Sequence, residues 1–318
     1  MLIKGFLIAL ILFFSLILAV AFYTLGERKL MAGVQHRQGP YKVGFKGLFQ
    51  PISDGVKLLK KEIIIPSRSS KNIFLIAPII TFCLSYVGWL FIFYSPNVIF
   101  LDLSVTMLLF FAITSLEVYG VIFAGWGSNS KYAFLGGLRT TAQMISYELT
   151  IGFCILAVAL LTQNFSFLAI AQMQEHIYFC FPLMPFVLIF FICMLAETNR
   201  APFDLPEAEA EIVAGYNVEY SGIIFALFFL GEYASMILLS NIFIFFFFGG
   251  GYFPFLEEFS FFVFSVKVFP IICLFVLIRA ALPRTRYDQL MNLGWETLLP
   301  LSFLLFIVEL VLVFILFY

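Results

Sequence analysis

The chain alternates between long runs of apolar residues and shorter polar connections. Each run is about as long as the roughly 20 helical residues that cross a lipid bilayer. The runs cover residues 5–25, 72–94, 102–125, 143–162, 177–196, 221–248, 261–282 and 297–318. We therefore predict an all-α fold, a polytopic transmembrane helical bundle of about eight spans. The connections leave little sequence for a second domain, so we expect residues 1–318 to form a single integral membrane domain.

The composition excludes an ordinary soluble domain. Hydrophobic residues make up 63% of the chain and charged residues 12%, and the mean hydropathy is +1.05. Soluble domains are typically about half apolar and about a quarter charged. The first run is longer than the core of a signal peptide, and no small-residue cleavage site precedes Glu27. We therefore expect this span to be retained.

Positive charges gather in every second connection. Fifteen of the 18 Lys and Arg residues lie in 26–71, 126–142, 197–220 and 283–296. With eight spans, these four connections share one side of the membrane. Because loops rich in Lys and Arg stay on the cytoplasmic or matrix side, we predict that the four connections face that side.

The first connection contains an amphipathic segment after Pro51. Four apolar residues fall on one face of a helix and three lysines lie toward the other. These are Ile52, Val56, Leu59 and Ile63, and Lys57, Lys60 and Lys61. The pattern predicts an interfacial helix with its lysines toward the lipid head groups. It serves either as a surface anchor or as one flank of an opening through which a lipophilic substrate leaves the bilayer.

Two further connections have distinctive residues. The short connection 126–142 is rich in glycine, and we predict a packed turn there. Near the last connection, Arg279, Arg284 and Arg286 lie beside Pro283, which ends the preceding helix. These arginines could anchor lipid head groups, pair with acidic residues elsewhere, or hold the polar head of a ligand.

Between residues 195 and 220, six carboxylates accompany a single cation, Arg200. The carboxylates are Glu197, Asp204, Glu207, Glu209, Glu211 and Glu219. Crowded carboxylates repel one another, and any that become buried must bind a proton or find a partner. In a membrane protein such residues can store and pass protons. This connection is therefore the first place to look for function.

Four more glutamates lie inside apolar runs, at Glu117, Glu148, Glu232 and Glu309. Each costs about 2.5–3.5 kcal/mol to place in a bilayer by insertion scales. The only basic residues inside runs are Lys267 and Arg279, too few to pair with all four. Each glutamate alone could be a helix-packing hydrogen bond. Glu148 and Glu232 together with the acidic connection favour a proton path. The adjoining Tyr147, Tyr220 and Tyr233 could bridge the glutamates.

The cysteines and histidines do not indicate a metal centre. The five cysteines are scattered in or beside apolar runs without a CxxC pair, and the two histidines lie near opposite membrane faces. Clusters and structural zinc need grouped ligands. We therefore expect this chain to bind no metal and to carry no redox centre of its own.

Motifs along nearly the whole chain resemble the NADH dehydrogenase subunit 1 family, the quinone-site membrane subunits of respiratory complex I (NADH:ubiquinone oxidoreductase). The motifs include Glu27-Arg-Lys, Gly47-Leu-Phe-Gln-Pro, Asp54-Gly-Val-Lys-Leu, Ser128-Asn-Ser-Lys-Tyr, Ile145-Ser-Tyr-Glu, Glu197-Thr-Asn-Arg-Ala-Pro-Phe-Asp-Leu-Pro-Glu, Asn217-Val-Glu-Tyr and Pro283-Arg-Thr-Arg-Tyr-Asp-Gln-Leu-Met. The Glu197–Glu207 motif is highly specific. The 44 phenylalanines favour a mitochondrially encoded member over a bacterial one.

The resemblance implies a subunit at the junction of the membrane and peripheral arms. Such a subunit forms most of the chamber that ubiquinone, the substrate, enters from the bilayer, and it couples quinone reduction to proton translocation. It binds no cofactor itself, because NADH, FMN and the iron–sulfur clusters belong to partner subunits. The expected partners are other membrane-arm subunits, the quinone-module subunits of the peripheral arm, ubiquinone and phospholipid, with no nucleic acid. The expected location is the mitochondrial inner membrane, with the bacterial plasma membrane as the alternative.

The resemblance also assigns roles at matching positions. The quinone path is implied at Glu27, Arg28, Asp54, Asp204, Phe229 and Arg279. The proton-linked acidic path is implied at Glu148, Glu197, Glu207, Glu209, Glu211 and Glu232. Three places depart from the family pattern and inherit no role: Tyr41-Lys42, Glu296, and Glu117, where the family usually has a small apolar residue. Glu309 is likewise left without a role.

Other functions remain open from the residues. The homologous subunit of a membrane-bound hydrogenase shares much of the motif set but handles no quinone, and neighbouring genes would distinguish it. A stand-alone ion transporter would transport in liposomes by itself, although no inverted repeat or mid-span lysine supports it. In a purely structural anchor, every glutamate could be replaced by glutamine without loss of activity.

The topology can be tested with engineered cysteines. We expect cysteines placed in 26–71 and 197–220 to be on the matrix side and to be protected from thiol reagents only in the assembled enzyme, where peripheral subunits cover them. Labelling efficiency before and after removal of the peripheral arm measures this. Free labelling from the intermembrane side would contradict the predicted orientation.

Overall fold

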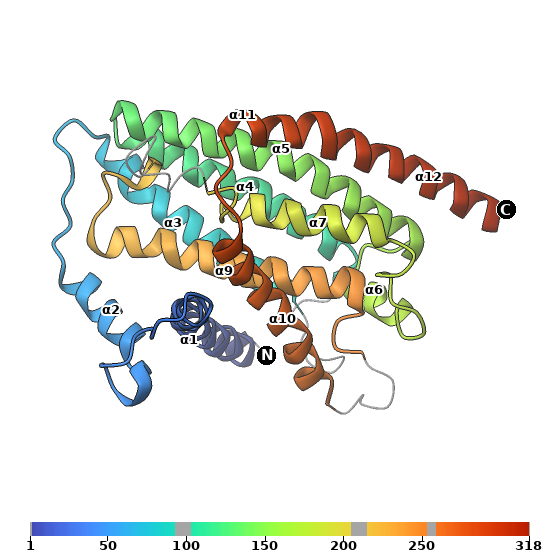
Figure 1. Cartoon of the computed structure of the whole chain (residues 1–318), viewed down its shortest axis with the longest axis horizontal. Coiled ribbons are helices and arrows are strands. Elements are labelled where there is room, and N and C mark those ends of the chain that lie inside the picture. Colours follow the sequence, from blue (N-terminus) through green and yellow to red (C-terminus); the bar gives the residue numbers. More distant parts are fainter. Residues whose placement is uncertain (1, 93–102, 205–214, 253–258, 318) are drawn as a thin grey trace.

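The computed structural model describes residues 2–92, 103–204, 215–252 and 259–317, and within them the secondary structure is helical (Figure 1). Seven of the described helices are long and apolar enough to cross a membrane, and one more is apolar but shorter. The apolar helices are α1 (Leu2–Val34), α3 (Lys71–Val87), α4 (Thr106–Gly127), α5 (Lys131–Thr162), α7 (Met184–Glu197), α9 (Gly222–Phe248), α10 (Ser260–Ala281) and α12 (Leu299–Phe317). The predicted all-α polytopic bundle is confirmed.

Short elements connect these helices. They are η1 (Phe45–Gly47), α2 (Gln50–Lys60), η2 (Gly88–Phe91), α6 (Phe167–Met173), η3 (Gly215–Asn217), α11 (Tyr287–Asn292) and η5 (Leu293–Leu298). The helix α2 confirms that an amphipathic helix follows the first span. Its apolar residues Ile52, Val56 and Leu59 are exposed in this chain. Its place at the membrane interface stays a prediction.

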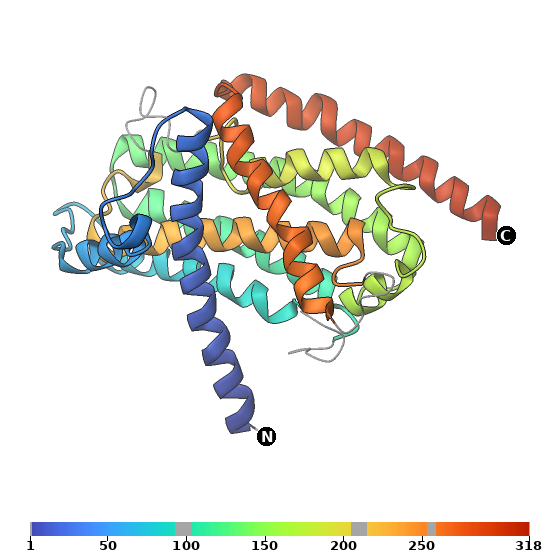
Figure 2. The same ribbon diagram turned by 60° about the horizontal axis from the view of Figure 1, so that its bottom comes forward.

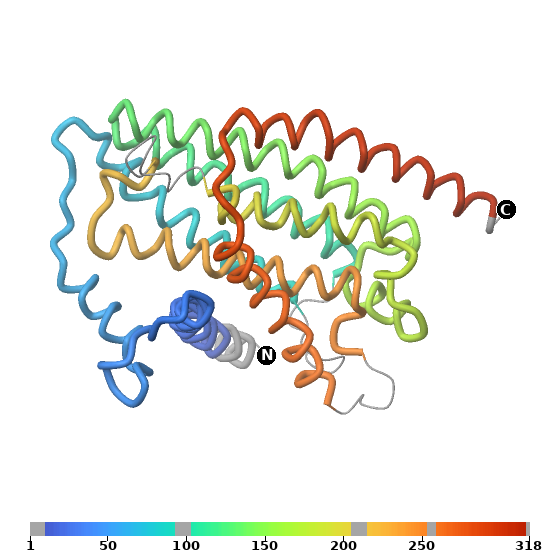
Figure 3. Tube along the Cα trace, in the orientation of Figure 1, coloured from blue at the N-terminus to red at the C-terminus, as the bar shows by residue number. Residues whose placement is uncertain are grey.

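Five helices form a closed ring. α3 packs against α4, α4 against α5, α5 against α7, α7 against α9, and α9 against α3. The five run side by side in Figure 1. The helices α1 and α10 pack against each other and against α9, outside the ring, and both cross α9 in Figure 2. The last helix, α12, packs on α5 and α7, and its C-terminal end extends past them, as the chain trace in Figure 3 shows.

The prediction of a turn at 126–142 is wrong over most of its length, because α5 begins at Lys131. The Ser130 hydroxyl caps this helix by accepting a hydrogen bond from the Ala133 amide at 3.3 Å. Glycines here serve helix packing instead of a turn. A Cβ built on Gly125 would lie only 3.3 Å from Gly137 Cα, so the two glycines let α4 and α5 approach closely.

Two other boundaries differ from the predicted spans. α1 continues to Val34, nine residues beyond the predicted end at 25, because the polar residues after 25 prolong the helix without breaking it. α7 begins at Met184, so the first part of the predicted span 177–196 is not helical. The length of an apolar run indicates which residues lie within the membrane. Hydrogen bonding and capping decide where the helix itself begins and ends.

Gly136 tests how closely α5 approaches η3. A Cβ at this position would meet Gly215 Cα at 2.6 Å and the Tyr216 amide nitrogen at 2.9 Å, both backbone atoms that cannot move alone. We expect Gly136→Ala to destabilise the assembled complex by about 1–3 kcal/mol, the usual cost of overpacking. Thermal inactivation of the purified complex measures this.

Gly152→Ala is the matched control in the same helix. Its added Cβ would lie 3.4 Å from the Phe111 ring, an ordinary contact. This variant should keep or slightly raise stability, because alanine favours helix more than glycine does. Equal heat resistance of both variants would mean that the α5–η3 contact is not tight in solution.

Candidate functional site

A buried carboxylate, Glu27 of α1, is the centre of a cluster of charged and aromatic side chains. Only 5% of its side chain is exposed, and its Oε1 accepts a hydrogen bond from Arg279 of α10. Arg200, in the turn after α7, lies 3.7 Å from the same oxygen. The Tyr233 hydroxyl of α9 donates to Oε2 at 2.6 Å. We call these four residues the Glu27 cluster; they join four segments that are distant in sequence.

The Glu27 cluster combines two cations with one anion. The Arg200 guanidinium also lies over the Tyr233 ring, 4.2 Å from its centroid, which is a cation–π contact. Residues of the cluster line a small cavity, where water-sized molecules have about 10 Å³ for their centres. The other lining residues are Tyr23, Met236, Phe275 and Val276. Guanidinium groups donate hydrogen bonds in a fixed fork geometry and stack on aromatic rings, so the two arginines can stabilise negative charge beside this cavity.

The turn that carries Arg200 folds back into the protein. Asn199 has a left-handed backbone with φ of 50°, a conformation common where helices end. The buried Gln143 of α5 holds both ends of the turn, because its side-chain amide donates to the carbonyls of Ala196 at 2.8 Å and Phe203 at 3.0 Å. The specific Glu197–Asp204 part of the motif is therefore fixed against the helices.

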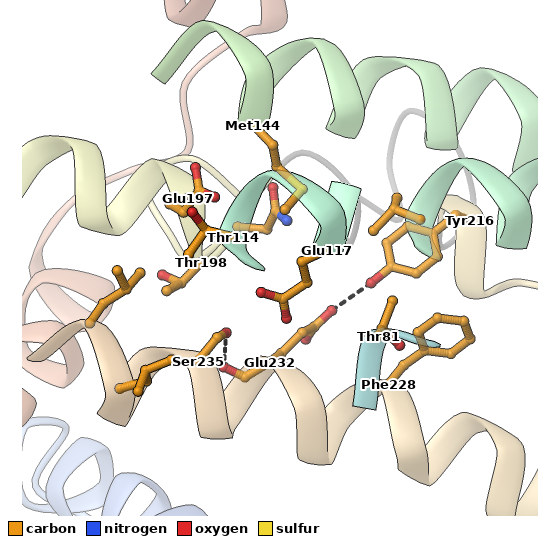
Figure 4. Close-up of a pocket in the computed structure, with 14 residues that line it drawn as sticks. Thr81, Thr114, Glu117, Met144, Glu197, Thr198, Tyr216, Phe228, Glu232 and Ser235 are labelled. Carbon is orange, nitrogen blue, oxygen red and sulfur yellow. Dashed lines mark hydrogen bonds between the residues drawn. The ribbon is translucent and has the colours of Figure 1, made fainter. Parts of the chain in front are cut away.

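A second cavity lies inside the ring of five helices, and Figure 4 shows its lining. Three carboxylates line it: Glu117 of α4, Glu197 at the end of α7, and Glu232 of α9. We call it the acidic cavity. The cavity has a volume of about 40 Å³ that the centre of a water molecule can occupy. This is enough for roughly three waters, at about 10–15 Å³ each. No Lys or Arg is among the described residues that line it.

Tyr216 of η3 contributes a directed hydrogen bond to the acidic cavity. It is 2% exposed, and its hydroxyl donates to Glu232 Oε1 at 2.7 Å (Figure 4). Edge-on contact with the Phe228 ring, at 5.4 Å between centroids, fixes its orientation. No sequence pattern singles out this tyrosine beyond its place in the acidic connection.

The hypothesis that tyrosines next to glutamates bridge them is wrong for two of the three. The Tyr147 hydroxyl donates to the Leu290 carbonyl at 3.0 Å, and the Tyr220 hydroxyl to the Ala124 carbonyl at 3.4 Å. Tyr233 does bind a carboxylate, as described above, but on α1. For Tyr147 and Tyr233, which lie in helices, neighbouring positions point about 100° apart, so adjacency in sequence does not bring the two side chains together.

The predicted quinone-path residues are divided among several contacts. Arg28 and Asp54 form an ion pair at 2.8 Å, with 51% and 36% of their side chains exposed. Asp204, which is buried, lies 3.3 Å from Arg284. Phe229 of α9 packs on a neighbouring ring of the same helix. Of the six predicted residues, only Glu27 and Arg279 belong to the Glu27 cluster.

The predicted acidic path is described at three of its six positions. Glu197 and Glu232 line the acidic cavity. Glu148 of α5 is not among the residues that line the cavity. The other three, Glu207, Glu209 and Glu211, lie outside the described residues.

The remaining intramembrane charges have different surroundings. Lys267 of α10 donates to three backbone carbonyls, that of Phe248 at the end of α9 and those of Gly250 and Tyr252 just after it, at 2.7–3.1 Å, which suits a cation at a helix C-terminus. Glu309 of α12 is 8% exposed, and neither of its oxygens has a hydrogen-bond partner among the described residues. In the described part of the chain, no three His, Cys, Asp or Glu side chains are placed so that they could hold one metal ion.

The Glu27 cluster and the acidic cavity share two short segments of backbone. On α9, Glu232 lines the acidic cavity while the next residue, Tyr233, binds Glu27. At the end of α7, Glu197 lines the acidic cavity, while Arg200 in the turn that follows belongs to the cluster. The two sites are therefore neighbours that share these segments.

The sequence profile of one family, described as NADH dehydrogenase, matches residues 7–310. The chain belongs to the NADH dehydrogenase family. Among curated relatives, NADH-ubiquinone oxidoreductase chain 1 of Chondrus crispus is 51% identical over 292 residues, 90% of each chain. The Arabidopsis thaliana protein of the same name is 53% identical over 293 residues, again 90% of each chain. An NADH-quinone oxidoreductase subunit from Rickettsia typhi is 53% identical over 294 residues, 90% of this chain and 87% of the relative.

Membership of the NADH dehydrogenase family confirms the resemblance to subunit 1. The relatives come from eukaryotes and from a bacterium, and the named ones are oxidoreductase subunits. They give no support to a stand-alone transporter or a hydrogenase subunit. Within the NADH dehydrogenase family, the function of this chain has to be argued from its two neighbouring sites.

Proposed function

We propose that this chain is the membrane subunit of respiratory complex I that forms much of the ubiquinone chamber and couples quinone reduction to proton translocation. The observation that carries the proposal is that the Glu27 cluster and the acidic cavity share two short segments of the chain. A cationic, aromatic cluster adjoins a cavity lined by carboxylates, through residues 232–233 and 197–200.

The Glu27 cluster suits the quinone side of this function. Reduction of a quinone takes up two electrons and two protons and passes through charged species. The guanidiniums of Arg200 and Arg279 stabilise negative charge that develops nearby. In the proposed enzyme the electrons come from an iron–sulfur cluster of a partner subunit, and this chain supplies the path and its electrostatics.

The acidic cavity suits the proton side. A unit charge that appears roughly 10 Å away at an effective dielectric constant of about 20 changes the energy of a carboxylate by about 1.7 kcal/mol. That exceeds the roughly 1.4 kcal/mol of one pKa unit. A charge change at the Glu27 cluster is therefore large enough to make a carboxylate of the acidic cavity bind or release a proton. Space for water connects such groups.

The proposal includes the surroundings of the chain. We place it in the mitochondrial inner membrane with its long odd-numbered connections toward the matrix. There the exposed apolar face of α2 contacts lipid, and the quinone-module subunits cover the charged connections. Other membrane-arm subunits contact the apolar faces, and NADH, FMN and the iron–sulfur clusters belong to partners.

The quinone role predicts a selective defect. We expect Arg279→Ala and Asp54→Ala to impair reduction of a quinone more than NADH oxidation by a hydrophilic artificial acceptor, which takes electrons upstream of the membrane. Arg279 binds Glu27 in the cluster, and Asp54 is paired with Arg28. The ratio of the two activities in the assembled complex measures the effect.

Arg68→Ala is the matched control, since it removes an exposed arginine that belongs to neither site. Its ratio of activities should equal that of the unaltered enzyme. An equal loss of both activities in Arg279→Ala, with the complex correctly assembled, would exclude a role in the quinone path.

The proton role predicts a second defect. Glutamine keeps the shape of Glu148 or Glu197 but cannot ionise. We expect Glu148→Gln or Glu197→Gln to give an assembled enzyme with slowed quinone-linked turnover and little or no proton pumping. Acidification in proteoliposomes, measured together with turnover, tests this. If both variants turn over and pump like the unaltered enzyme, the acidic path is wrong and these glutamates are structural.

A further inference from the structure

We propose that Glu117 of α4 and Glu232 of α9 form a carboxyl pair across the acidic cavity and share one proton. The pair rests on the proposed proton role of this cavity and extends it to a residue for which the family resemblance implies no function. Glu117 occupies a position where that family usually has a small apolar residue, so the sequence motifs do not include it.

The two side chains approach from separate helices. Both line the acidic cavity, and Figure 4 shows their carboxyl groups pointing toward each other at its centre. When ionised, the two groups repel each other. The helices that carry them both pack against α3, so the backbone holds the pair in place instead of letting it separate.

A hydrogen bond to one member of the pair assigns different states to the two glutamates. The Tyr216 hydroxyl donates to Glu232 Oε1, which makes that oxygen an acceptor and favours the ionised form of Glu232. Two carboxylates that share a site do not both ionise readily, because like charges repel in a medium of low polarity. Glu117 therefore carries the proton and donates it toward Glu232.

The described lining of the cavity is rich in acidic and poor in basic side chains. Glu197 faces the cavity from α7 and adds a third carboxylate, while α3 contributes Thr81 and α5 contributes Met144. Among the described residues of the lining there is no cation. A bound proton is then the simplest way to reduce the negative charge.

Glu197 independently indicates that the cavity takes a small polar ligand. It is 7% exposed, and its Oε2 has no hydrogen-bond partner among the described residues. Buried polar atoms without a protein partner normally bind water or a proton. The cavity that Glu197 lines has about 40 Å³ of space for water, so the proposed proton route includes Glu197 as well as the carboxyl pair.

The pair can be tested in the assembled complex with Glu117→Gln, Glu232→Gln and the double variant. The control is Glu309→Gln, which removes a buried glutamate that does not line the cavity. The readouts are the pH profile of quinone-linked turnover, proton pumping in proteoliposomes, and the infrared carboxylic-acid band in the redox difference spectrum. If Glu117→Gln does not assemble, Glu117→Ala restores the small residue type usual at this position and replaces it.

When the pair loses its shared proton, both glutamates become negatively charged and repel each other, so the pair keeps this proton to a higher pH than a single glutamate would. We expect either single variant to lose the carboxylic-acid band and to move the alkaline limb of turnover to lower pH. The shift should be about one pH unit, a tenfold change in proton occupancy. The double variant should be no more impaired than the more severe single variant, and Glu309→Gln should keep the pH profile.

Different failures point to different errors. If Glu117→Gln matches the unaltered enzyme in all three measurements while Glu232→Gln and Glu197→Gln are slowed, the pair is wrong and the acidic path stands. Multiplied effects in the double variant would mean that the two glutamates act independently, which also overturns the pair. If all three single variants behave like the unaltered enzyme, the proton role of the cavity fails as well.

Discussion

The contacts of the Glu27 carboxylate hold the polar interior of this protein together. An isolated charge inside an apolar bundle is unstable, and Glu27 meets that constraint with two arginines and a tyrosine. Because each partner comes from a different segment, one carboxylate attaches α1 and α10 to the five-helix ring and draws the turn after α7 inward. The position of Arg200, and with it that of Glu197, depends on this arrangement.

The same turn explains why two chemically different sites lie side by side. Gln143 fixes its carbonyls from within α5, so successive residues of the turn point in different directions from a rigid backbone. Arg200 points to the Glu27 cluster, and Glu197 to the acidic cavity. Residues 232 and 233 of α9 divide in the same way. In the proposed mechanism, a charge change in one site acts electrostatically on the other without a large movement.

Small residues make the close packing possible. Gly125 and Gly137 let α4 and α5 approach, and Gly136 lets η3 lie against α5. That approach places Tyr216 where it can donate to Glu232. In this protein these glycines lie within helices instead of turns. Inside a membrane the hydrophobic effect does not drive helices together, so helix contacts depend on close packing, which small residues permit. For this reason the glycine-rich stretch after residue 126 has the composition of a turn and the structure of a helix.

The sequence alone determined the helical class, the approximate spans and the family, since these depend on apolar run length and on local motifs. It also identified Glu27, Arg279, Glu197 and Glu232 as functional candidates. Only the tertiary structure decided which of them meet, because helices distant in sequence bring their side chains together through packing that no local pattern encodes. Tyr216 and Arg200 gained their partners in this way, and so did Glu117, a residue outside the family pattern that shares a cavity with two other carboxylates.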